Sequence, residues 1–406
     1  MTQTFWTRRE WLTGTAAMAL GSGPVTFGPS GPGTIPITGR AMPRLKRFDA
    51  VMVEVIDQHG FPGASLAMAK DGRLVFARGY GFADRKNRTA VRPAMQFGIG
   101  SVSKTITAVA VPKLFEAGKV RLDDHAFEIL GDLKPLSGAR RDPRRGRITV
   151  RMLLNHSSGY PNETYLGEAA RAFGVGRDEL TADQLVRYGL GKPLAYAPGT
   201  QAHYSNMGYV VLGQIVEQTS GQPYVQYVMR HVLEPMGIRR AAMGTRSKTY
   251  PAGWVHRYDH SGKELGPLAP TAGGAAGFWV TSTVELIRFL TSVGGSREPQ
   301  FLAPETRREM FAPPPPSLKP RANGKYFGLG WDTVESSPQG LIYTKNGGVQ
   351  GYRAFVGHMQ DGVDWAFLAT DATGDKGENA ETAVAITREI ERTRAWPDLD
   401  LFERFN

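Results

Sequence analysis

Three short polar motifs in a fixed order constrain the fold of this chain more than its composition does. The first is Ser101-Val102-Ser103-Lys104, in which a lysine follows a serine by three residues, a spacing found nowhere else in the sequence. Residues three apart share one face of a helix, so a helix here would bring the lysine ammonium group to the serine hydroxyl. A desolvated lysine can take the serine proton and make that hydroxyl a nucleophile.

Two partner motifs follow along the chain, Tyr204-Ser205-Asn206 and Lys345-Asn346-Gly347. An S-x-x-K pattern alone is weak evidence, because serine and lysine are common residues. It becomes strong when S/Y-x-N and K-x-G motifs follow in that order. Chance occurrence in a core helix, a loop and a strand is the alternative explanation, and the matching order disfavours it. The fold must therefore bring three distant segments to one place.

Hydrophobic patterns predict strands near both ends of the chain and helices between them. We expect a strand hairpin at residues 64–79, around Lys70-Asp71-Gly72, and a buried helix at residues 101–117 with Phe115 on its inner side. Further helices are expected at residues 45–58, 149–155, 181–190, 205–218 and 379–394, and strands at 326–334, 341–344, 352–357 and 365–371.

This order of elements indicates a sheet domain formed by the two ends of the chain, with a helical domain inserted. We assign residues 40–100 and 270–406 to the sheet domain and residues 101–269 to the helical domain that carries the nucleophile helix. The expected fold class is α/β (α+β), a mixed antiparallel sheet flanked by helices.

Residues 1–39 are predicted to be an export signal followed by a linker rich in glycine and proline. Arg8 and Arg9 precede an uncharged stretch that continues to Gly39. Its mildly apolar part, residues 11–20, is too short for a membrane span of roughly 20 residues. The pattern is typical of a twin-arginine secretion signal, which predicts a periplasmic or secreted protein without a stable membrane span. A disordered tail with a chance arginine pair is the alternative.

Composition excludes several kinds of site. The chain has no cysteine, so a disulfide framework, a thiolate zinc site and a cysteine nucleophile are impossible. The formal net charge of +11 is spread along the sequence, and its one dense basic run, residues 140–147, contains proline and glycine and is expected to be a solvated loop. We therefore expect no nucleic-acid partner, and we predict neither a metal nor another cofactor.

These motifs and their flanks resemble the serine β-lactamase and penicillin-binding-protein superfamily. The resemblance covers roughly residues 45–394 and is nearest to class C β-lactamases, D-amino-acid peptidases and β-lactamase-like esterases. Besides the three motifs it rests on the flanking segments 97–104, 148–161, 204–209 and 345–352. It implies a mixed sheet covered by helices, a helical domain, and an active site in the cleft between them.

The resemblance also implies a role for each motif residue. Ser101 would attack a carbonyl carbon, and Lys104 would accept the serine proton. Tyr204 would be a second acid/base, with its pKa lowered by Lys104 and Lys345. Asn206 would bind a substrate amide and Lys104.

In the last motif, Lys345 and Asn346 would contact the substrate, with Lys345 steering an anionic group. The backbone N–H groups of Ser101 and Gly348 would form the oxyanion hole. Asn346 stands where the family often has threonine, whose hydroxyl helps to bind a substrate carboxylate. We therefore expect the geometry of carboxylate binding to differ from that of the family. No counterpart of the class A deacylating glutamate is found, so Tyr204 must serve that step.

Other patterns are weaker. Tyr160-Pro161-Asn162 and Lys70-Asp71-Gly72 repeat two motifs out of order, and residues 98–105 lack the second glycine of a phosphate-binding loop. His256 and His260 have a metal-like spacing, but the segment reads as a turn.

The sequence thus predicts a serine hydrolase acting through an acyl-enzyme on an ester, a β-lactam or a D-amino-acid amide, with esters slightly favoured. Its partner would be a small-molecule or peptidoglycan-like substrate, and the oligomeric state stays open. The alternative is a penicillin-binding sensor that is acylated without turnover.

Overall fold

The computed structural model describes residues 35–321, 324–337, 340–371 and 378–405. The arginine pair of the expected export signal lies outside the described residues, so export stays a prediction. Within the described ranges, no helix is both long enough and apolar enough to cross a lipid bilayer.

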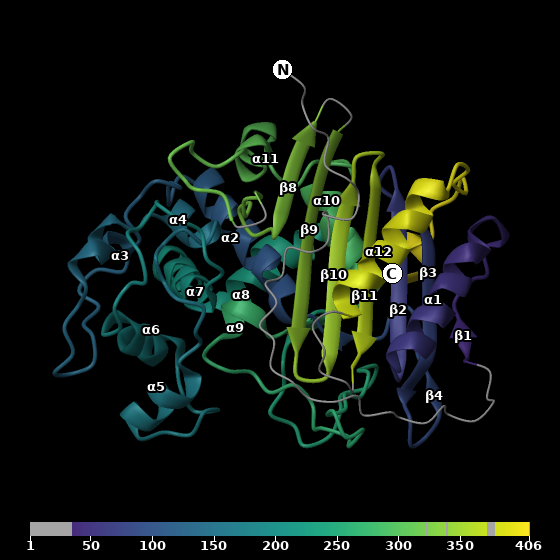
Figure 1. Ribbon diagram of the computed structural model, residues 1–406, viewed down its shortest axis with the longest axis horizontal. Helices are drawn as coiled ribbons and strands as arrows, with labels where there is room; N and C mark the ends of the chain where they lie inside the picture. Colours follow the sequence, from purple (N-terminus) through teal and green to yellow (C-terminus); the bar gives the residue numbers. More distant parts are fainter. Residues whose placement is uncertain (1–34, 322–323, 338–339, 372–377, 406) are drawn as a thin grey trace.

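A twisted antiparallel sheet forms one side of the molecule (Figure 1). Its strands come from both ends of the chain, and the short strand β4 pairs with β3 outside the main order. In spatial order the others are β1 (Ile37–Thr38), β3 (Arg73–Asp84), β2 (Gly63–Lys70), β11 (Val363–Thr370), β10 (Tyr352–Met359), β9 (Gly340–Val349) and β8 (Thr333–Ser337); β4 is Thr89–Ala90. This arrangement confirms the expected fold class.

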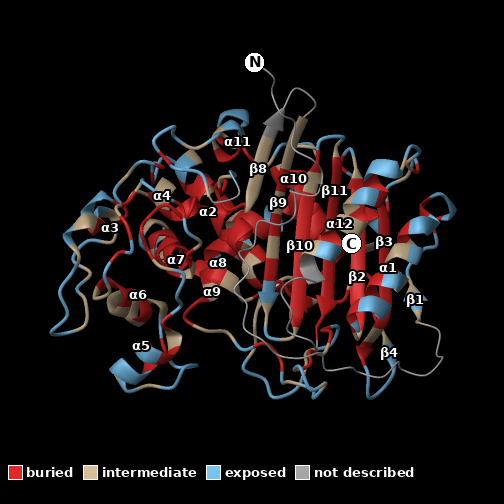
Figure 2. Ribbon diagram, viewed as in Figure 1, coloured by how far each residue is buried: buried red, intermediate tan, exposed pale blue. Residues whose placement is uncertain are grey.

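Helices cover both faces of the sheet. On one face α1 (Lys46–His59) packs against α12 (Glu378–Arg392), and their apolar side chains join those of the central strands in one core cluster. On the other face α10 (Thr283–Val293) packs against β2 and β11 and belongs to the larger core. Figure 2 shows the central strands buried along most of their length. The strands therefore read as apolar runs, because neither face meets water.

The other side of the molecule is helical, with the almost completely buried α2 (Ser103–Glu116) between it and the sheet (Figure 1). The α7 helix (Asn206–Ser220) packs against α2 and is apolar on nearly all sides. Around α7 lie α3 (Ala126–Ile129), α4 (Val150–Leu154), α6 (Ala182–Leu190), α8 (Tyr224–Val228) and α9 (Gly274–Gly277). The remaining helices are α5 (Leu166–Phe173), which packs on α6, and α11 (Pro304–Met310).

A second, small sheet joins the helical side to the main sheet. Its strands are β5 (Phe97–Gly98), β7 (Trp279–Thr281) and β6 (Ala242–Met243), in that order. Because β5 runs directly into the Ser101 turn, this small sheet sets the position of the predicted nucleophile.

Most of the expected elements are present, and two expectations were wrong. Residues 326–332 form no strand, because Gly330 has a positive φ of 93° and the chain turns there before β8 begins. Phe115 is 39% exposed rather than buried, since Leu114 takes the inner side at this end of α2. The hairpin at Asp71-Gly72 is confirmed, with β2 and β3 paired on either side of it.

Candidate active site

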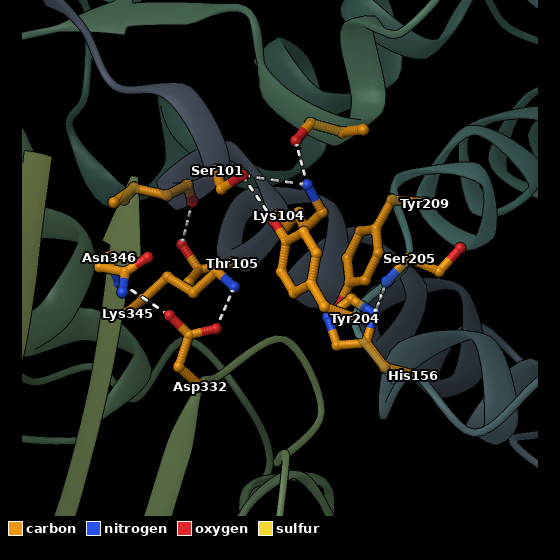
Figure 3. A network of polar contacts seen from close by, with 12 residues as sticks. Ser101, Lys104, Thr105, His156, Tyr204, Ser205, Tyr209, Asp332, Lys345 and Asn346 are labelled. Carbon is orange, nitrogen blue, oxygen red and sulfur yellow. Dashed lines mark hydrogen bonds and ion pairs between the residues drawn. The ribbon is translucent and has the colours of Figure 1, made fainter. Parts of the chain in front are cut away.

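Ser101 lies in a single 3₁₀ turn, Gly100–Val102, directly before α2. The turn is anchored from behind, because the Ser103 hydroxyl accepts a hydrogen bond from the backbone N–H of Trp279 at 3.1 Å. Ser101 is partly exposed, whereas Lys104 is completely buried one turn later. The expected helical spacing therefore brings the two side chains together at the N-terminus of α2, as Figure 3 shows.

The Lys104 amine has three oxygen neighbours. Its Nζ lies 3.2 Å from Ser101 Oγ, 2.7 Å from Asn206 Oδ1 and 2.5 Å from the carbonyl oxygen of Ala276. Burial and the nearby charge of Lys345 hold the pKa of Lys104 well below its ordinary value of 10.5. A neutral amine has two N–H groups and one lone pair. In that form the two carbonyl oxygens can take both N–H groups, which leaves the lone pair for the Ser101 hydroxyl.

Tyr204 completes the contact with the nucleophile. Its hydroxyl donates to Ser101 Oγ at 2.5 Å. Burial and the charge of Asp332 raise the pKa of Tyr204 above its ordinary value, and the hydrogen bond with Ser101 only partly offsets them. The expected lowering of this pKa by the two lysines was therefore wrong. In this state Tyr204 is a proton donor, and Lys104 is the group suited to accept the serine proton.

The Tyr204 ring is held by a buried histidine. His156 packs against it with ring centroids 4.6 Å apart, and His156 Nδ1 accepts a hydrogen bond from the Ser205 backbone N–H at 3.1 Å. Burial and the charges of Lys345 and Lys104 keep the pKa of His156 well below its ordinary value. A neutral ring can accept this hydrogen bond, whereas an imidazolium cannot. The geometry therefore gives His156 a structural role beneath Tyr204.

The third motif lies on β9, on the opposite side of Ser101 from α7. Lys345 is completely buried, and its Nζ donates to Asp332 Oδ1 at 2.5 Å. The other carboxylate oxygen, Asp332 Oδ2, accepts the Asn346 backbone N–H at 3.0 Å. Sequence reasoning missed Asp332. A signal was available, because pairing two consecutive strands with Ser337 opposite Gly340 places Asp332 opposite Lys345.

Strand β9 meets the nucleophile turn backbone to backbone. A Cβ atom at Gly347 would lie 2.3 Å from the carbonyl oxygen of Ile99 and 2.9 Å from the Ser101 nitrogen, so only glycine fits there. Gly348, next along the strand, is exposed, and a Cβ atom there would meet the end of the Arg353 side chain at 3.1 Å rather than the backbone of the nucleophile turn. The contact brings the backbones of Ser101 and Gly348 close together, as an oxyanion hole requires. The assignment of those two N–H groups stays a prediction.

A cavity of about 200 Å³ opens beside Ser101. Its walls are mostly apolar and come from α5, α6, α7, the α9 segment and the end of β9; the lining residues are Ser101, Thr164, Leu166, Leu185, Asn206, Val210, Gly273, Ala276, Gly277, Phe278, Gly348 and Val349. Lys345 is not among them. The cavity can therefore take an uncharged group of a few carbon atoms next to the nucleophile.

The structure thus brings the predicted residues of all three motifs to one place. Ser101, Lys104, Tyr204 and Asn206 are linked by hydrogen bonds, and Lys345 stands with its ammonium group 4.9 Å from the centre of the Tyr204 ring. Besides Asp332, sequence reasoning missed the Ala276 carbonyl and the cavity walls, which carry no distinctive side-chain chemistry.

The out-of-order motifs are engaged elsewhere. Lys70 pairs with Asp71 in its hairpin, and Tyr160 is buried beneath the Arg145 guanidinium, 4.6 Å from the ring centre.

His256 Nδ1 lies 3.1 Å from Glu264 and 3.9 Å from Asp84. These three side chains lie close enough together to share a metal ion, but acidic groups grouped in this way are common without one.

A serine, a buried lysine and a tyrosine, set between an antiparallel sheet and a helical region, form the kind of site found in the serine hydrolases of the β-lactamase fold. The chain belongs to the Beta-lactamase family, whose profile matches residues 48–387.

Two curated relatives illustrate the range of the family. Protein flp of Staphylococcus aureus (strain MW2) is 27% identical over 194 residues, which cover 48% of this chain and 37% of flp. Esterase EstB of Burkholderia gladioli is 30% identical over 201 residues, which cover 48% of this chain and 50% of EstB. The matched part thus spans half or less of each relative.

Solved structures share the fold over most of the chain. The octameric penicillin-binding protein homologue from Pyrococcus abyssi has a TM-score of 0.68 and 25% identity, over 85% of this chain and 77% of that one. The D-amino acid amidase from Ochrobactrum anthropi SV3 has a TM-score of 0.69 and 23% identity, over 86% of this chain and 100% of the amidase. The likeness to the amidase shows the fold alone.

Proposed function

We propose that this protein hydrolyses carboxylic esters through an acyl-enzyme on Ser101, with an apolar acyl group held in the adjoining cavity. The observation that carries the proposal is the position of Ser101 Oγ. It lies between the Lys104 amine at 3.2 Å and the Tyr204 hydroxyl at 2.5 Å, at the edge of an apolar cavity. A nucleophile, a base and an acid are thus within reach of one bound carbonyl group.

The reaction follows from these positions. Ser101 Oγ attacks the ester carbonyl carbon while its proton passes to the neutral Lys104 amine. The negative charge on the carbonyl oxygen would be met by backbone N–H groups at the contact between β9 and the nucleophile turn. When the ester C–O bond breaks, Tyr204 supplies a proton to the leaving alkoxide, and the Lys104 ammonium group gives its extra proton back to the Tyr204 phenolate. Water then attacks the acyl-enzyme, and the same groups act in reverse.

Esters are favoured over β-lactams and D-amino-acid amides by the surroundings of Ser101. The cavity wall is mainly aliphatic and aromatic, and the cation of the third motif is paired with Asp332. The alkoxide of an ester is also a better leaving group than the nitrogen of an amide. Its departure therefore depends less on proton donation by Tyr204. EstB, which is 30% identical over the matched part, is named an esterase.

The test is a substrate panel on purified protein. It comprises para-nitrophenyl esters of increasing acyl length, nitrocefin and a D-alanine amide, with Ser101→Ala as the control. We expect repeated turnover of short and medium esters by the wild type and none by Ser101→Ala. A burst of one nitrophenolate per protein without further turnover would instead identify an acylated sensor. Turnover that persists undiminished in Ser101→Ala would show that Ser101 is not the nucleophile.

A matched pair of variants tests the place of the acyl group. Thr164 is exposed and lines the cavity, whereas Asn162, two residues earlier, is exposed and does not. Thr164→Trp should lower kcat/KM for the longer esters while sparing acetate, because the indole narrows the cavity mouth. Asn162→Trp should leave the chain-length profile as in the wild type. If the two variants had the same chain-length profile, the proposal that the acyl group binds in this cavity would be wrong.

A further inference from the structure

The cation that a family resemblance assigns to anion binding is not available in this protein. Lys345 has no solvent-exposed side-chain surface, and its Nζ is 2.5 Å from a carboxylate oxygen of Asp332. The Asp332 side chain is 17% exposed. A charge that is both covered and paired with a carboxylate gives an incoming anion little attraction.

Asp332 is fixed in this position from several directions. Its backbone N–H donates to the Thr344 carbonyl at 2.9 Å, which continues the pairing of β8 with β9. Its own carbonyl accepts from the Arg321 guanidinium at 2.9 Å, and its second carboxylate oxygen holds the Asn346 N–H. The ion pair is therefore part of the sheet edge, and Figure 3 shows it directly beside the Tyr204 ring.

The charge of Asp332 also reaches the catalytic groups. It opposes the lowering of the pKa of Lys345 and of Lys104, and it contributes to the raised pKa of Tyr204. These effects have the sign expected of an anion beside two cations and a phenol. A substrate carboxylate placed here would add a second negative charge beside the carboxylate that already pairs with Lys345.

We propose that Asp332 sets the charge preference of the site. Its carboxylate holds Lys345 in a covered ion pair, so that the enzyme takes substrates that are neutral next to Asn346 and discriminates against those that carry a carboxylate there. This inference rests on the proposed serine hydrolase function and narrows its substrates to uncharged esters. It also accounts for Asn346 at the position where the family often has threonine. A threonine hydroxyl that helps to bind a substrate carboxylate would add little beside a lysine already paired with Asp332.

The test compares affinities for two inhibitors that differ only in charge. Arylboronic acids accept the serine oxygen and form a tetrahedral adduct, so they report binding at Ser101 without turnover. The meta and para isomers of carbamoylphenylboronic acid and carboxyphenylboronic acid have nearly the same shape, and only the second carries a carboxylate. Inhibition constants are measured at neutral and mildly acidic pH, with para-nitrophenyl butyrate as the reporter substrate.

Four variants separate charge from structure. Asp332→Asn removes the charge at constant size, and Asp332→Ala also opens the space that a ligand carboxylate needs. Asp332→Glu keeps the charge. Asp398→Asn makes the same change in net charge at an exposed residue that pairs with Arg73 on β3, separated from β9 by three strands.

We expect the wild type to bind the carbamoyl compounds more tightly. Asp332→Asn and Asp332→Ala should move the ratio towards the carboxyl compounds by roughly ten- to a hundredfold, the value of one charge-assisted hydrogen bond. The shift should be larger at mildly acidic pH, where an unpaired Lys345 keeps its proton more readily. Asp332→Glu and Asp398→Asn should keep the wild-type ratio. Asn346→Thr alone should move it less than Asp332→Ala, since the ion pair remains.

Two kinds of failure are distinguishable. A wild type that already prefers the carboxyl compounds overturns the role of Asp332, and this measurement needs no variant to fold. An unchanged ratio in Asp332 variants that still hydrolyse para-nitrophenyl butyrate does the same and leaves the esterase intact. A wild type that hydrolyses no ester and forms no boronate adduct overturns the proposed function, and this inference with it.

Discussion

Replacing Lys104 by methionine tests the roles assigned to the lysine and the tyrosine. The change removes the amine beside Ser101 and keeps an unbranched side chain of similar length in the buried position. Loss of a general base typically costs about 10²–10⁴ in rate. Two acceptors, Asn206 Oδ1 and the Ala276 carbonyl, also lose their donor, at about 1–3 kcal/mol each. Burying the lysine amine itself costs free energy, and methionine avoids that cost. The net loss of stability should therefore be smaller than the sum for the two acceptors.

Tyr204→Phe is the matched variant, since it keeps the ring that packs on His156 and removes only the hydroxyl. If Tyr204 is the acid, its loss should slow ethyl butyrate more than para-nitrophenyl butyrate, because nitrophenolate leaves without a proton. If Lys104 is the base, its loss should slow both esters alike.

The pH dependence gives a second, independent readout. Below the pKa of Lys104 the amine is protonated, so the rate of acylation should fall about tenfold per pH unit and rise as pH increases. This limb should lie well below the ordinary range of a lysine, because burial and Lys345 lower that pKa. The raised pKa of Tyr204 predicts no decline at the pH where an ordinary phenol ionises.

Stopped-flow measurement of the nitrophenolate burst across pH provides the assay. The rising limb should vanish in Lys104→Met and persist in Tyr204→Phe. The opposite pattern, a limb that survives the loss of the lysine and disappears with the phenol, would refute the assignment of Lys104 as the base.

Two further predictions follow from the structure and the sequence. Gly347→Ala should destabilise the protein by about 1–3 kcal/mol, measured by thermal unfolding, because the added methyl group meets the nucleophile turn, whereas Gly348→Ala should cost much less; equal losses would contradict the close backbone contact. Replacing Arg8 and Arg9 by lysine should leave an unprocessed precursor in the cytoplasm, seen by fractionation and immunoblotting, and unchanged secretion of that variant would argue against a twin-arginine signal.

The elements that the sequence predicted well are those with a local signal. The hairpin at Asp71-Gly72 depends on turn chemistry, and the α1 helix ends at Gly60, which has a positive φ of 63°. The Ser101–Lys104 contact depends on helical spacing alone. Residues 326–332 were expected to be a strand because an apolar run that packs against α2 as a loop has the same composition as a buried strand.

The parts of the site that could not be predicted depend on long-range packing. The pKa of Tyr204 was expected to fall because two lysines lie close to it in the motif pattern. Burial of the phenol and the unforeseen carboxylate of Asp332 act in the other direction. The direction of a pKa shift can be predicted only when every nearby charge is known. The charge that was missing here is Asp332, which the register of β8 and β9 places opposite Lys345.

The backbone contact between β9 and the nucleophile turn has a consequence for how the sequence of this site can vary. No side chain separates Gly347 from Ile99, so substitution cannot reshape that junction without displacing the reactive serine. Variation compatible with catalysis is confined to the surrounding rim, chiefly Thr164, Leu166, Phe278 and Val349. A laboratory library that randomises those four positions and leaves Gly347 intact should retain a much larger share of active clones than one that randomises Gly347 and its neighbours in the nucleophile turn.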